Sequence, residues 1–260
     1  MRQEHHSVST IDELRDALVE TLRGVGTVQD EIGLELKVDF FLSSILGNLS
    51  LHPPDRVWEW FLEKRSESNL KTEIIPLKET DGWLIDERTG NIHHDTGKFY
   101  SIKGIKVSSD RRETKDWSQP IIDQPEVGIL GFLVKKIHGI YHFLVQAKEE
   151  PGNIDNVQLT TTLMATRSNF EQVHGGKEPF FLDYFTNPKD RRVLVKELQS
   201  EEGARFYKKN NLNIVIELHP HEIVDVPEMF IWMTLCQIKE FLTHKNTVNA
   251  CARSVIACLP

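Results

Sequence analysis

The sequence has few cysteines, and their number and spacing exclude two common classes of small stabilised protein. Its 260 residues include Cys236, Cys251 and Cys258 as the three cysteines. An odd number cannot pair completely, and none of the three belongs to a Cys-x-x-Cys pair, so neither a disulfide framework nor a zinc site is indicated. Buried thiols in a reducing compartment are the interpretation that this usage favours, and we expect a cytoplasmic protein.

Long apolar runs and an excess of positive charge are also missing. No segment approaches the ~18 uncharged apolar residues that a membrane-spanning helix needs. The charged start, MRQEHH, has no apolar region behind it, so we expect no secretory signal and no membrane association. The formal net charge of −8 argues against a general nucleic-acid-binding protein. A few local cations are still enough to hold a small anionic ligand.

What is present has the composition of an ordinary globular protein, 39% hydrophobic and 27% charged. Apolar periodicity divides the chain into a helical tract over 10–65, a β tract over 70–170 and a C-terminal tract. That last tract is predicted to hold one strand, at 212–218. It is also predicted to hold three helical segments, at 190–209, 228–243 and 247–258. This order predicts a mixed α/β or α+β fold, with 1–66 as a helical extension and 67–260 as the main module.

Two local signals mark helix starts in the first tract. Thr10 with Glu13 has the form of a capping box ahead of leucines spaced along one helix face. Pro53-Pro54 favours the start of a second helix. We expect that helix to pack through a stripe of Trp58, Phe61 and Leu62.

Turn residues punctuate the β tract. Thr89-Gly90 and Thr96-Gly97 predict turns, Lys103-Gly104 predicts a break, and His138-Gly139 predicts the turn of a hairpin. In the second strand of that hairpin, 141–148, alternation places Tyr141, Phe143, Val145 and Ala147 on one face. His142, Leu144, Gln146 and Lys148 share the other face, which either solvent or a cleft would explain.

The turn after that strand favours a cleft. Lys148, Glu150 and Asn153 are expected at its rim, within reach of Arg167 on the next strand. Arginine presents a rigid fork of donors that matches phosphate oxygens, and Ser168 and Asn169 can add to it. An exposed arginine in a loop is commonly only solvated, so the motif alone does not decide between a phosphate site and a surface loop.

Aromatic and histidine residues near turns leave similar choices. Trp83 and Trp117 lie beside turn residues, where each is either an anchor at the edge of the core or a platform for a base or sugar ring. His93, His94 and His174 match no common ligand spacing, and we expect no metal site.

One stretch has a form close to a known motif. KELQSEEGARFY, residues 196–207, resembles the helix of the Nudix box, in which paired glutamates hold magnesium on a diphosphate. Here Glu201-Glu202 fall one residue late, and Leu182 stands where that motif requires glycine. A shift of one residue rotates a helical side chain by about 100°, so a metal-dependent diphosphate hydrolase is disfavoured.

Several longer stretches together resemble one enzyme family, the NDP-hexose 2,3-dehydratases of deoxysugar biosynthesis. They include TGNIHHDTGKFYSIKGIKV, WSQPIIDQPEVGILGF, HFLVQAKEEPGNIDNVQLTTTLMATRSNF, LQSEEGARFYKKNNLNIVIEL and NTVNACARSVIACLP, in the family's order from about residue 57 to the C-terminus. The resemblance implies a Nudix-like fold without the Nudix box. It also implies a dTDP-linked 4-keto-6-deoxy sugar as substrate, and no cofactor.

The resemblance also implies a set of site residues. For binding the sugar nucleotide, these are Trp83, Thr166, Arg167, Ser168, Asn169, Phe170, Gly203, Ala204 and Arg205. Trp117 and Asn153, which lie beside turns, are further candidates for this binding. Lys148 and Glu150 are the first candidates for proton transfer, with His174 and Tyr207 behind them. Which group is the base and which the acid stays open.

Family members typically carry two such modules in tandem, whereas this sequence contains one. If the tandem form arose by duplication, one module is expected to pair with a second copy, and we predict a homodimer. The apolar helices predicted at 230–242 and 253–259 are either core or part of that interface. Three functions fit this pattern: 2,3-dehydration, sugar-nucleotide binding without catalysis, and ketoisomerisation or epimerisation of the same substrate class.

Overall fold

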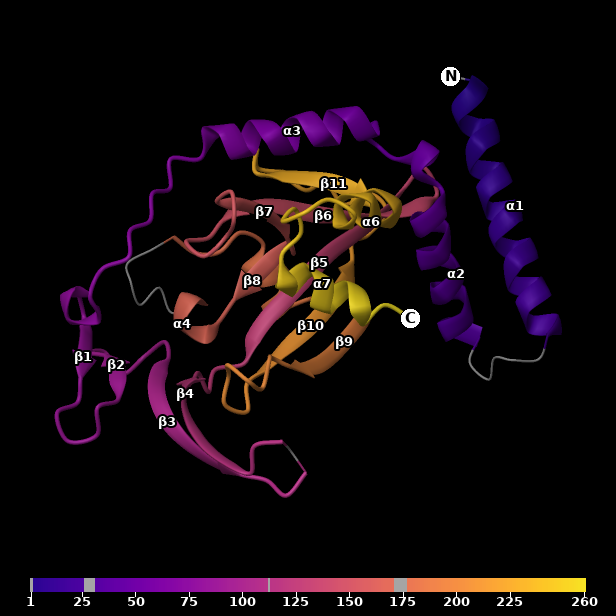
Figure 1. The fold of residues 1–260 in the computed structure, drawn as a ribbon. Coiled ribbons are helices and arrows are strands. Elements are labelled where there is room, and N and C mark those ends of the chain that lie inside the picture. The colour runs from indigo at the N-terminus through magenta and orange to yellow at the C-terminus, as the bar shows by residue number, and fades with distance from the viewer. Residues whose placement is uncertain (1, 26–30, 112, 171–176) are drawn as a thin grey trace.

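Two helices at the N-terminal end pack against each other on one side of the molecule (Figure 1). The computed structural model describes residues 2–25, 31–111, 113–170 and 177–260. α1 (Arg2–Gly24) and α2 (Glu31–Ile45) are joined by Arg15, whose Nε donates to Oδ1 of buried Asp39 at 2.8 Å. The prediction of a capping box at Thr10 is wrong, because α1 runs through this residue and an N-cap needs a non-helical backbone.

α3 (Pro54–Glu67) begins at the predicted pair of prolines, with Pro53 as N-cap and Pro54 in the first turn. Its buried face differs from the predicted stripe, since Leu62 is 47% exposed. The buried side chains are Val57, Trp60 and Phe61. They belong to the main core of the protein, so α3 packs on the large sheet described next.

The large sheet has seven strands and is mixed. Its order is β11 (Phe230–Thr234), β6 (Ile140–Glu149), β5 (Gly128–Ile137), β10 (Asn210–Glu217) and β9 (Arg192–Ser200), with β7 (Val157–Thr160) on β6 and β8 (Leu163–Ala165) on β5. β5 and β10 are parallel, and the other pairs are antiparallel. The predicted hairpin is confirmed, because His138 and Gly139, with φ of 52° and 82°, form the turn from β5 to β6.

β5 and β6 pair only near their turn and then diverge into a fork. Their ladder ends at Val134 and Phe143. Beyond that point β7 pairs with β6 and β8 pairs with β5, so the fork is filled by the segment between them. Thr162 closes it: its Oγ1 accepts from the Leu133 amide at 2.9 Å and donates to the Leu144 carbonyl at 2.5 Å.

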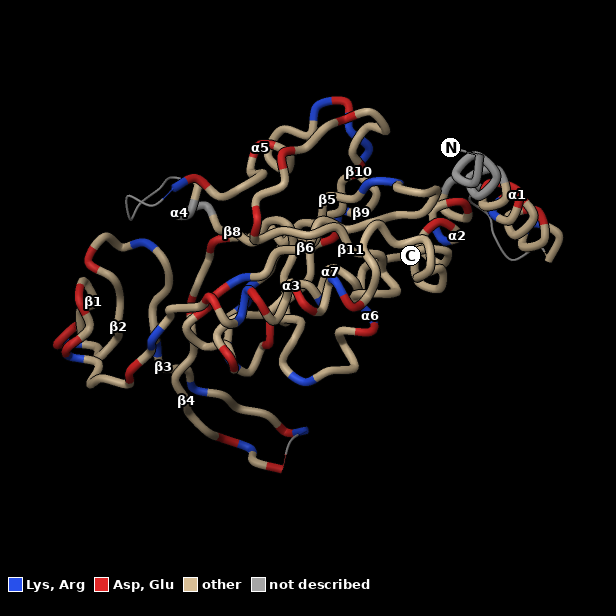
Figure 2. Tube along the Cα trace, turned by 90° about the horizontal axis from the view of Figure 1, so that it is seen from above, with Lys and Arg blue, Asp and Glu red and all other residues tan. Residues whose placement is uncertain are grey.

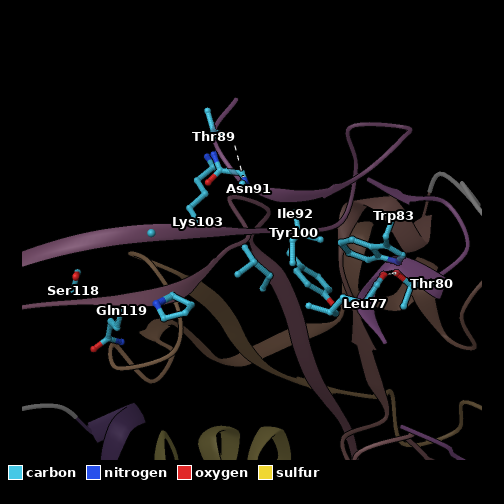
Figure 3. A pocket seen from close by; sticks show the side chains of 14 residues that line it. Leu77, Thr80, Trp83, Thr89, Asn91, Ile92, Tyr100, Lys103, Ser118 and Gln119 are labelled. Atoms are coloured by element: carbon cyan, nitrogen blue, oxygen red, sulfur yellow. Dashed lines mark hydrogen bonds between the residues drawn. The ribbon is translucent and has the colours of Figure 1, made fainter. Parts of the chain in front are cut away.

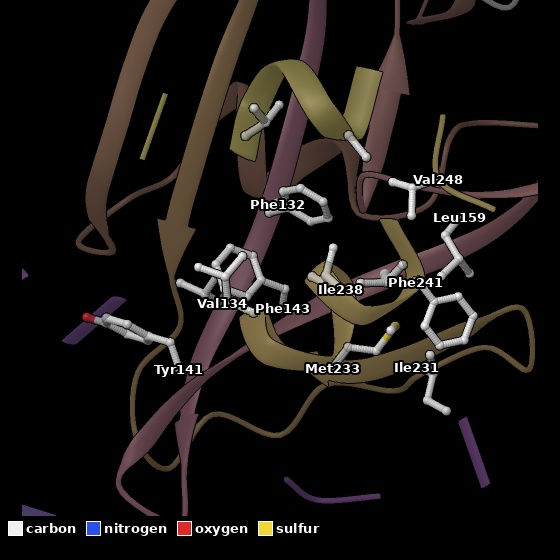
Figure 4. Close-up of a cluster of buried hydrophobic side chains, with 14 of the residues drawn as sticks. Phe132, Val134, Tyr141, Phe143, Leu159, Ile231, Met233, Ile238, Phe241 and Val248 are labelled. Atoms are coloured by element: carbon white, nitrogen blue, oxygen red, sulfur yellow. The ribbon is translucent and has the colours of Figure 1, made fainter. Parts of the chain in front are cut away.

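Helices cover one face of this sheet with the largest apolar core (Figure 4). Tyr141, Phe143, Val145 and Ala147 all lie in that core, which confirms the predicted alternation along 141–148. The opposite face is not solvated as a whole, because His142 and Leu144 are fully buried there. A second core on that side includes α5 (Leu182–Thr186).

The predicted helix at 190–209 is wrong. These residues form β9 and a turn, and β9 pairs with β10 along its length. The stretch that resembles the Nudix box therefore lies on a strand and a turn. The predicted helix at 228–243 is wrong in its first part, because β11 occupies 230–234 and α6 (Leu235–Leu242) follows. Thr234 ends the strand and caps the helix through a capping box with Gln237.

The strand at 212–218 and the helix at 247–258 are confirmed by β10 and by α7 (Ala250–Ala257). α6 and α7 place Leu235, Ile238, Phe241, Ala252 and Val255 in the chain's own core. Their apolar character is thus explained by packing within the chain, which is the first of the two alternatives considered from the sequence.

A small four-stranded sheet stands at the other side of the molecule from α1 and α2 (Figures 1 and 2). Its strands, in order, are β1 (Trp83–Ile85), β2 (Ile92–His94), β3 (Ser101–Ser108) and β4 (Asp116–Asp123). Gly90 and Gly97 have positive φ, which confirms both Thr-Gly turns. The break predicted at Lys103-Gly104 is wrong, because β3 continues through both residues.

Charged residues of both signs are spread over the outer loops and helices (Figure 2). In the part of the chain that the structure describes, no helix has the length and apolar character needed to cross a membrane. The short elements that remain are η1 (Gly47–Leu49), η2 (Leu77–Glu79) and α4 (Arg167–Phe170). The mixed α/β class predicted from the sequence is confirmed.

Candidate active site

A cavity of about 490 Å³ lies where the small sheet meets the turn after β8. It brings together Trp83, Thr166 and Ser168, three residues predicted from the sequence to contact a sugar nucleotide. Trp83 is in β1, whereas the other two flank the start of α4. The remaining lining residues are Asp81, His94, Phe99, Tyr100 and Gln124.

Aromatic rings lie between the residues that line this cavity and those that line a larger one on the small sheet, and Figure 3 shows the larger one. Trp83 and Tyr100 line both, and their ring centroids are 4.7 Å apart. The larger cavity, about 820 Å³, is completed by apolar residues such as Ile92 and Pro120 and by the polar side chains of Asn91 and Lys103. A ring-lined concavity with a few polar groups is the usual form of a small-molecule site.

Ser168 is held by a carboxylate. Its backbone N–H and its hydroxyl donate to Oε2 of Glu126, at 3.2 and 2.9 Å. Its Oγ also lies 2.9 Å from Oγ1 of Thr166. Only 2% of Ser168 is exposed, so this hydroxyl serves the shape of the turn as well as the lining of the cavity.

A buried lysine lies behind Glu126. Nζ of Lys209 donates to the backbone carbonyl of Glu126, and 4% of the residue is exposed. Burial lowers the pKa of Lys209, because the charged form loses water, while the carboxylates of Glu201 and Glu126 act in the opposite direction. The network thus runs from the cavity wall into the interior.

Lys148, a predicted proton-transfer residue, lies near the end of β6 and is partly buried. Burial lowers its pKa, and the neighbouring Glu150 carboxylate and Cys251 oppose this shift. The neutral amine therefore forms at a lower pH than in an exposed lysine. Oε2 of Glu150 accepts from Nδ2 of Asn249 at 3.3 Å, so the two candidates lie beside the start of α7.

Cys251 connects these groups with Glu201. Burial raises the pKa of the thiol to about 11, and the charges of Glu201 and Glu150 contribute in the same direction. Lys148 acts against them. Glu201 accepts a hydrogen bond from Nδ2 of Asn211, the second residue of β10. Lys148, Glu150, Cys251 and Glu201 therefore form one electrostatically coupled polar centre.

Three predicted binding residues, Gly203, Ala204 and Arg205, lie beside β4. They are in a turn between two strands rather than on the helix expected from the sequence. The Ala204 carbonyl accepts from Nε2 of Gln119 at 3.0 Å, and the Ile122 amide donates to the Arg205 carbonyl at 2.8 Å. Gln119 in turn accepts from Nε1 of Trp117 at 2.9 Å. Gly203 belongs to the same turn, and Tyr207, at 45% exposure, follows it.

The other predicted residues have varied places. Nδ2 of Asn153 donates to the carbonyls of Lys148 and Asn156, which ties it to its own turn. Phe170 is partly buried against the second core. Arg167 and Asn169 belong to α4, of which the structure describes the backbone at these two positions. His174 lies outside the described residues.

Sequence reasoning missed Cys251 of the polar centre and several residues of the hydrogen-bond networks around it and around Ser168. Glu126, Lys209, Asn211, Asn249 and Cys251 all stand within stretches that carry the family resemblance, but none was singled out. The alternation of Asn211 and Asn213 along β10 was the available signal, since it places two amides on one strand face. Asn213 is fully buried, and its Oδ1 has no hydrogen-bond partner among the described residues.

Across the described ranges, no group of three or more His, Cys, Asp or Glu side chains is arranged to hold a metal ion. Nδ1 of His94 instead lies 2.8 Å from Oγ1 of Thr96 and 3.0 Å from Oδ1 of Asp95.

Comparison with known proteins identifies the family. The model of the NDP-hexose 2,3-dehydratase family matches residues 55–259, from the start of α3 to the penultimate residue. The chain belongs to this family. The predicted family is thereby confirmed, and the matched part of this NDP-hexose 2,3-dehydratase family member contains both sheets, the ring-lined cavities and the polar centre.

Curated relatives of this family member share its sequence over one part of their length. A dTDP-4-dehydro-6-deoxy-alpha-D-glucopyranose 2,3-dehydratase of Saccharopolyspora spinosa is 41% identical over 223 residues, 86% of this chain and 45% of that protein. A protein of the same name from Amycolatopsis orientalis is 42% identical over 208 residues, 77% of this chain and 43% of that protein. The chain thus spans less than half the length of these relatives.

Similarity to solved structures is low. A crystal structure of an ADP compounds hydrolase matches 61% of this chain and 83% of its own, with 12% identity and a TM-score of 0.39. At this level the likeness carries no argument about the site.

Proposed function

We propose that the protein catalyses 2,3-dehydration of a dTDP-4-keto-6-deoxyhexose and contributes to deoxysugar biosynthesis. The observation that carries this proposal is the family match over 55–259, and the relatives' names supply the substrate class. The cavity lined by Trp83, Thr166 and Ser168, together with the partly buried Lys148, whose pKa burial lowers, supports an enzyme rather than a module that only binds. We also propose that the protein acts as a homodimer.

The chemistry requires proton transfer and no change of oxidation state overall. The C4 ketone acidifies the proton on C3, and its removal gives an enolate. The C2–O bond then breaks, the hydroxyl takes a proton and leaves as water, and a 2,3-enol remains. Protonation at C2 converts this enol into a 3,4-diketo-2,6-dideoxy sugar. Positioned proton transfer commonly contributes about 10²–10⁴-fold to such a rate.

Lys148 and Glu150 are the groups to which we assign this transfer. Burial lowers the pKa of Lys148 and so favours its neutral amine, which can act as a base. Lys148 therefore takes the proton from C3. The ammonium formed is then a donor for the departing C2 hydroxyl. The charge of Glu150 stabilises that ammonium between the two steps. Thr166 and Ser168, on the cavity wall, are assigned to the sugar nucleotide.

The test is incubation of the purified protein with dTDP-4-keto-6-deoxyglucose, followed by mass spectrometry of the product. We expect loss of one water in buffer with excess chelator, because no metal is needed for the proposed steps. A Lys148→Met variant should bind the substrate but not dehydrate it. A product of unchanged mass would support an isomerase or epimerase, and binding without turnover would support a non-catalytic module.

A further inference from the structure

We propose that Glu126 and Lys209 form a brace that positions the turn at 166–170 against the ring-lined cavity. Both are positioning residues for ligand binding, since each acts through the turn rather than through the ligand. The identity of the ligand as a sugar nucleotide rests on the proposed function. The brace itself rests on hydrogen bonds and burial.

The turn needs an external anchor because α4 has four residues. So short a helix has little stability of its own, because nucleation fixes several dihedral angles for one hydrogen bond. Glu126 supplies the anchor, since one carboxylate oxygen accepts from both the amide and the hydroxyl of Ser168. Hydrogen bonds to an ionised group are stronger than neutral ones. The start of α4 is therefore tied to the loop before β5.

Lys209 fixes the loop that carries Glu126. It directly precedes β10, and its Nζ donates to the Glu126 carbonyl. A buried ammonium is costly unless it is paired and hydrogen-bonded, and here the carbonyl and the nearby carboxylates of Glu126 and Glu201 compensate. Next to it, the amide of Gly128, the first residue of β5, donates to Oδ1 of Asn211 in β10 at 3.2 Å. Lys209 and Asn211 therefore hold positions 126 and 128, on either side of the point where β5 begins.

The consequence concerns the shape of the cavity. Thr166 and Ser168 line it together with Trp83, which comes from the small sheet. The brace thus positions the part of the cavity wall formed by Thr166 and Ser168, and β1 positions the part formed by Trp83. If the brace is removed, the wall at 166–170 loses its fixed distance from the rings. Binding should weaken, and the polar centre beside α7 should keep its chemistry, so KM is expected to rise more than kcat falls.

Two measurements on the 260-residue chain test the brace. The first is hydrogen exchange of a peptide covering 163–170, which contains the Ser168 amide that donates to Glu126. The second is calorimetric titration with dTDP. The variants are Glu126→Ala, Glu126→Gln and Lys209→Met, with Glu59→Gln and Lys106→Met as matched controls on exposed positions of α3 and β3.

We expect Glu126→Ala and Lys209→Met to speed exchange of this peptide and to weaken dTDP binding by about tenfold or more. Glu126→Gln keeps an oxygen acceptor and should recover most of the affinity, to within about threefold of wild type. The two control variants should match wild type in both measurements.

Wild-type exchange in both Glu126→Ala and Lys209→Met would overturn the brace, whatever the ligand. Failure of the wild-type protein to bind dTDP would instead count against the proposed function, and the exchange result would still decide about the brace. If Glu126→Ala does not fold, Lys209→Met and Glu126→Gln remain as the deciding pair. Equal hydrogen exchange of the 163–170 peptide in these two variants would reject the brace.

Discussion

His142 shows how a single buried residue makes stability depend on pH. It is fully buried, its Nε2 accepts from the Leu51 amide at 2.9 Å, and its Nδ1 lies 3.1 Å from the Ile140 carbonyl. These partners require the neutral tautomer with the proton on Nδ1. Burial, the largest cause, lowers the pKa of His142 from 6.5 to about 4.

Stability should therefore fall as the pH falls from 6.5 towards 4. In that range the unfolded chain binds a proton at position 142 and the folded chain does not, which favours unfolding. Above pH 6.5 His142 is neutral in both the folded and the unfolded chain, so it causes no loss of stability. Between pH 7.5 and pH 5 we expect a loss of about 2 kcal/mol from this residue. Urea unfolding of the wild type and of His142→Gln at both pH values measures it. Parallel pH dependence in the two proteins would contradict the assignment.

Arg167 carries the second prediction at this scale. We expect Arg167→Ala to weaken dTDP binding by roughly 1.5–3 kcal/mol, the range for hydrogen bonds to charged groups. The midpoint of thermal unfolding should change little, because Arg167 is assigned to the ligand. Calorimetry measures the affinity, and Arg56→Ala on α3 is the control. An unchanged dissociation constant would move the diphosphate to another part of the protein.

Among the elements, the fork between β5 and β6 is the feature on which the site depends. It admits β7 and β8, and these lead the chain from the polar centre to the turn that begins α4. Thr162, at 2% exposure, holds the fork through two backbone groups. One hydroxyl therefore bridges the two strands from which the chain reaches both functional regions.

Thr162→Val should destabilise the fold by about 2–4 kcal/mol. The substitution keeps the shape but leaves a buried amide at Leu133 and a buried carbonyl at Leu144 without this partner, each costing about 1–3 kcal/mol. Denaturant unfolding is the measurement. As a control, Thr21→Val at an exposed position of α1 should change stability by less than about 0.5 kcal/mol. Equal effects at the two sites would show that the fork does not need the hydroxyl.

At the scale of the whole molecule, the homodimer stays a prediction. α6 and α7 bury apolar side chains in the core of the chain, so their apolar character alone does not indicate an interface. On α2, Phe41 and Ile45 are 52% and 51% exposed, and Leu51 nearby is 39% exposed. These side chains offer apolar surface of the kind that protein contacts cover.

We expect sedimentation at low micromolar concentration to show a species of twice the 30.0 kDa chain mass. A stable pair should bury more than about 1,600 Å² in total. Phe41→Glu should shift the sedimentation towards the single chain, whereas Leu84→Glu, on the small sheet, should not. A 30.0 kDa species that dehydrates the substrate would refute the dimer.

The sequence by itself determined features that depend on short-range chemistry. The turn at His138-Gly139, the alternation through Tyr141 and Phe143, and the helix start at Pro54 follow from local backbone preference and side-chain period. The family, too, could be predicted from stretches of consecutive residues. One of these stretches contains Thr166 and Ser168, which the fold brings to one cavity with Trp83.

Only the tertiary structure decided what depends on partners far along the chain. Residues 192–200 have a pattern that a helix would also accept, and pairing with β10 makes them a strand. Lys209 reads in sequence as one of two adjacent surface lysines, Lys208 and Lys209, and only the loop carrying Glu126 gives it a buried role. The physical reason is the same in both cases: burial and hydrogen bonding depend on distances in space, which periodicity along the chain does not contain.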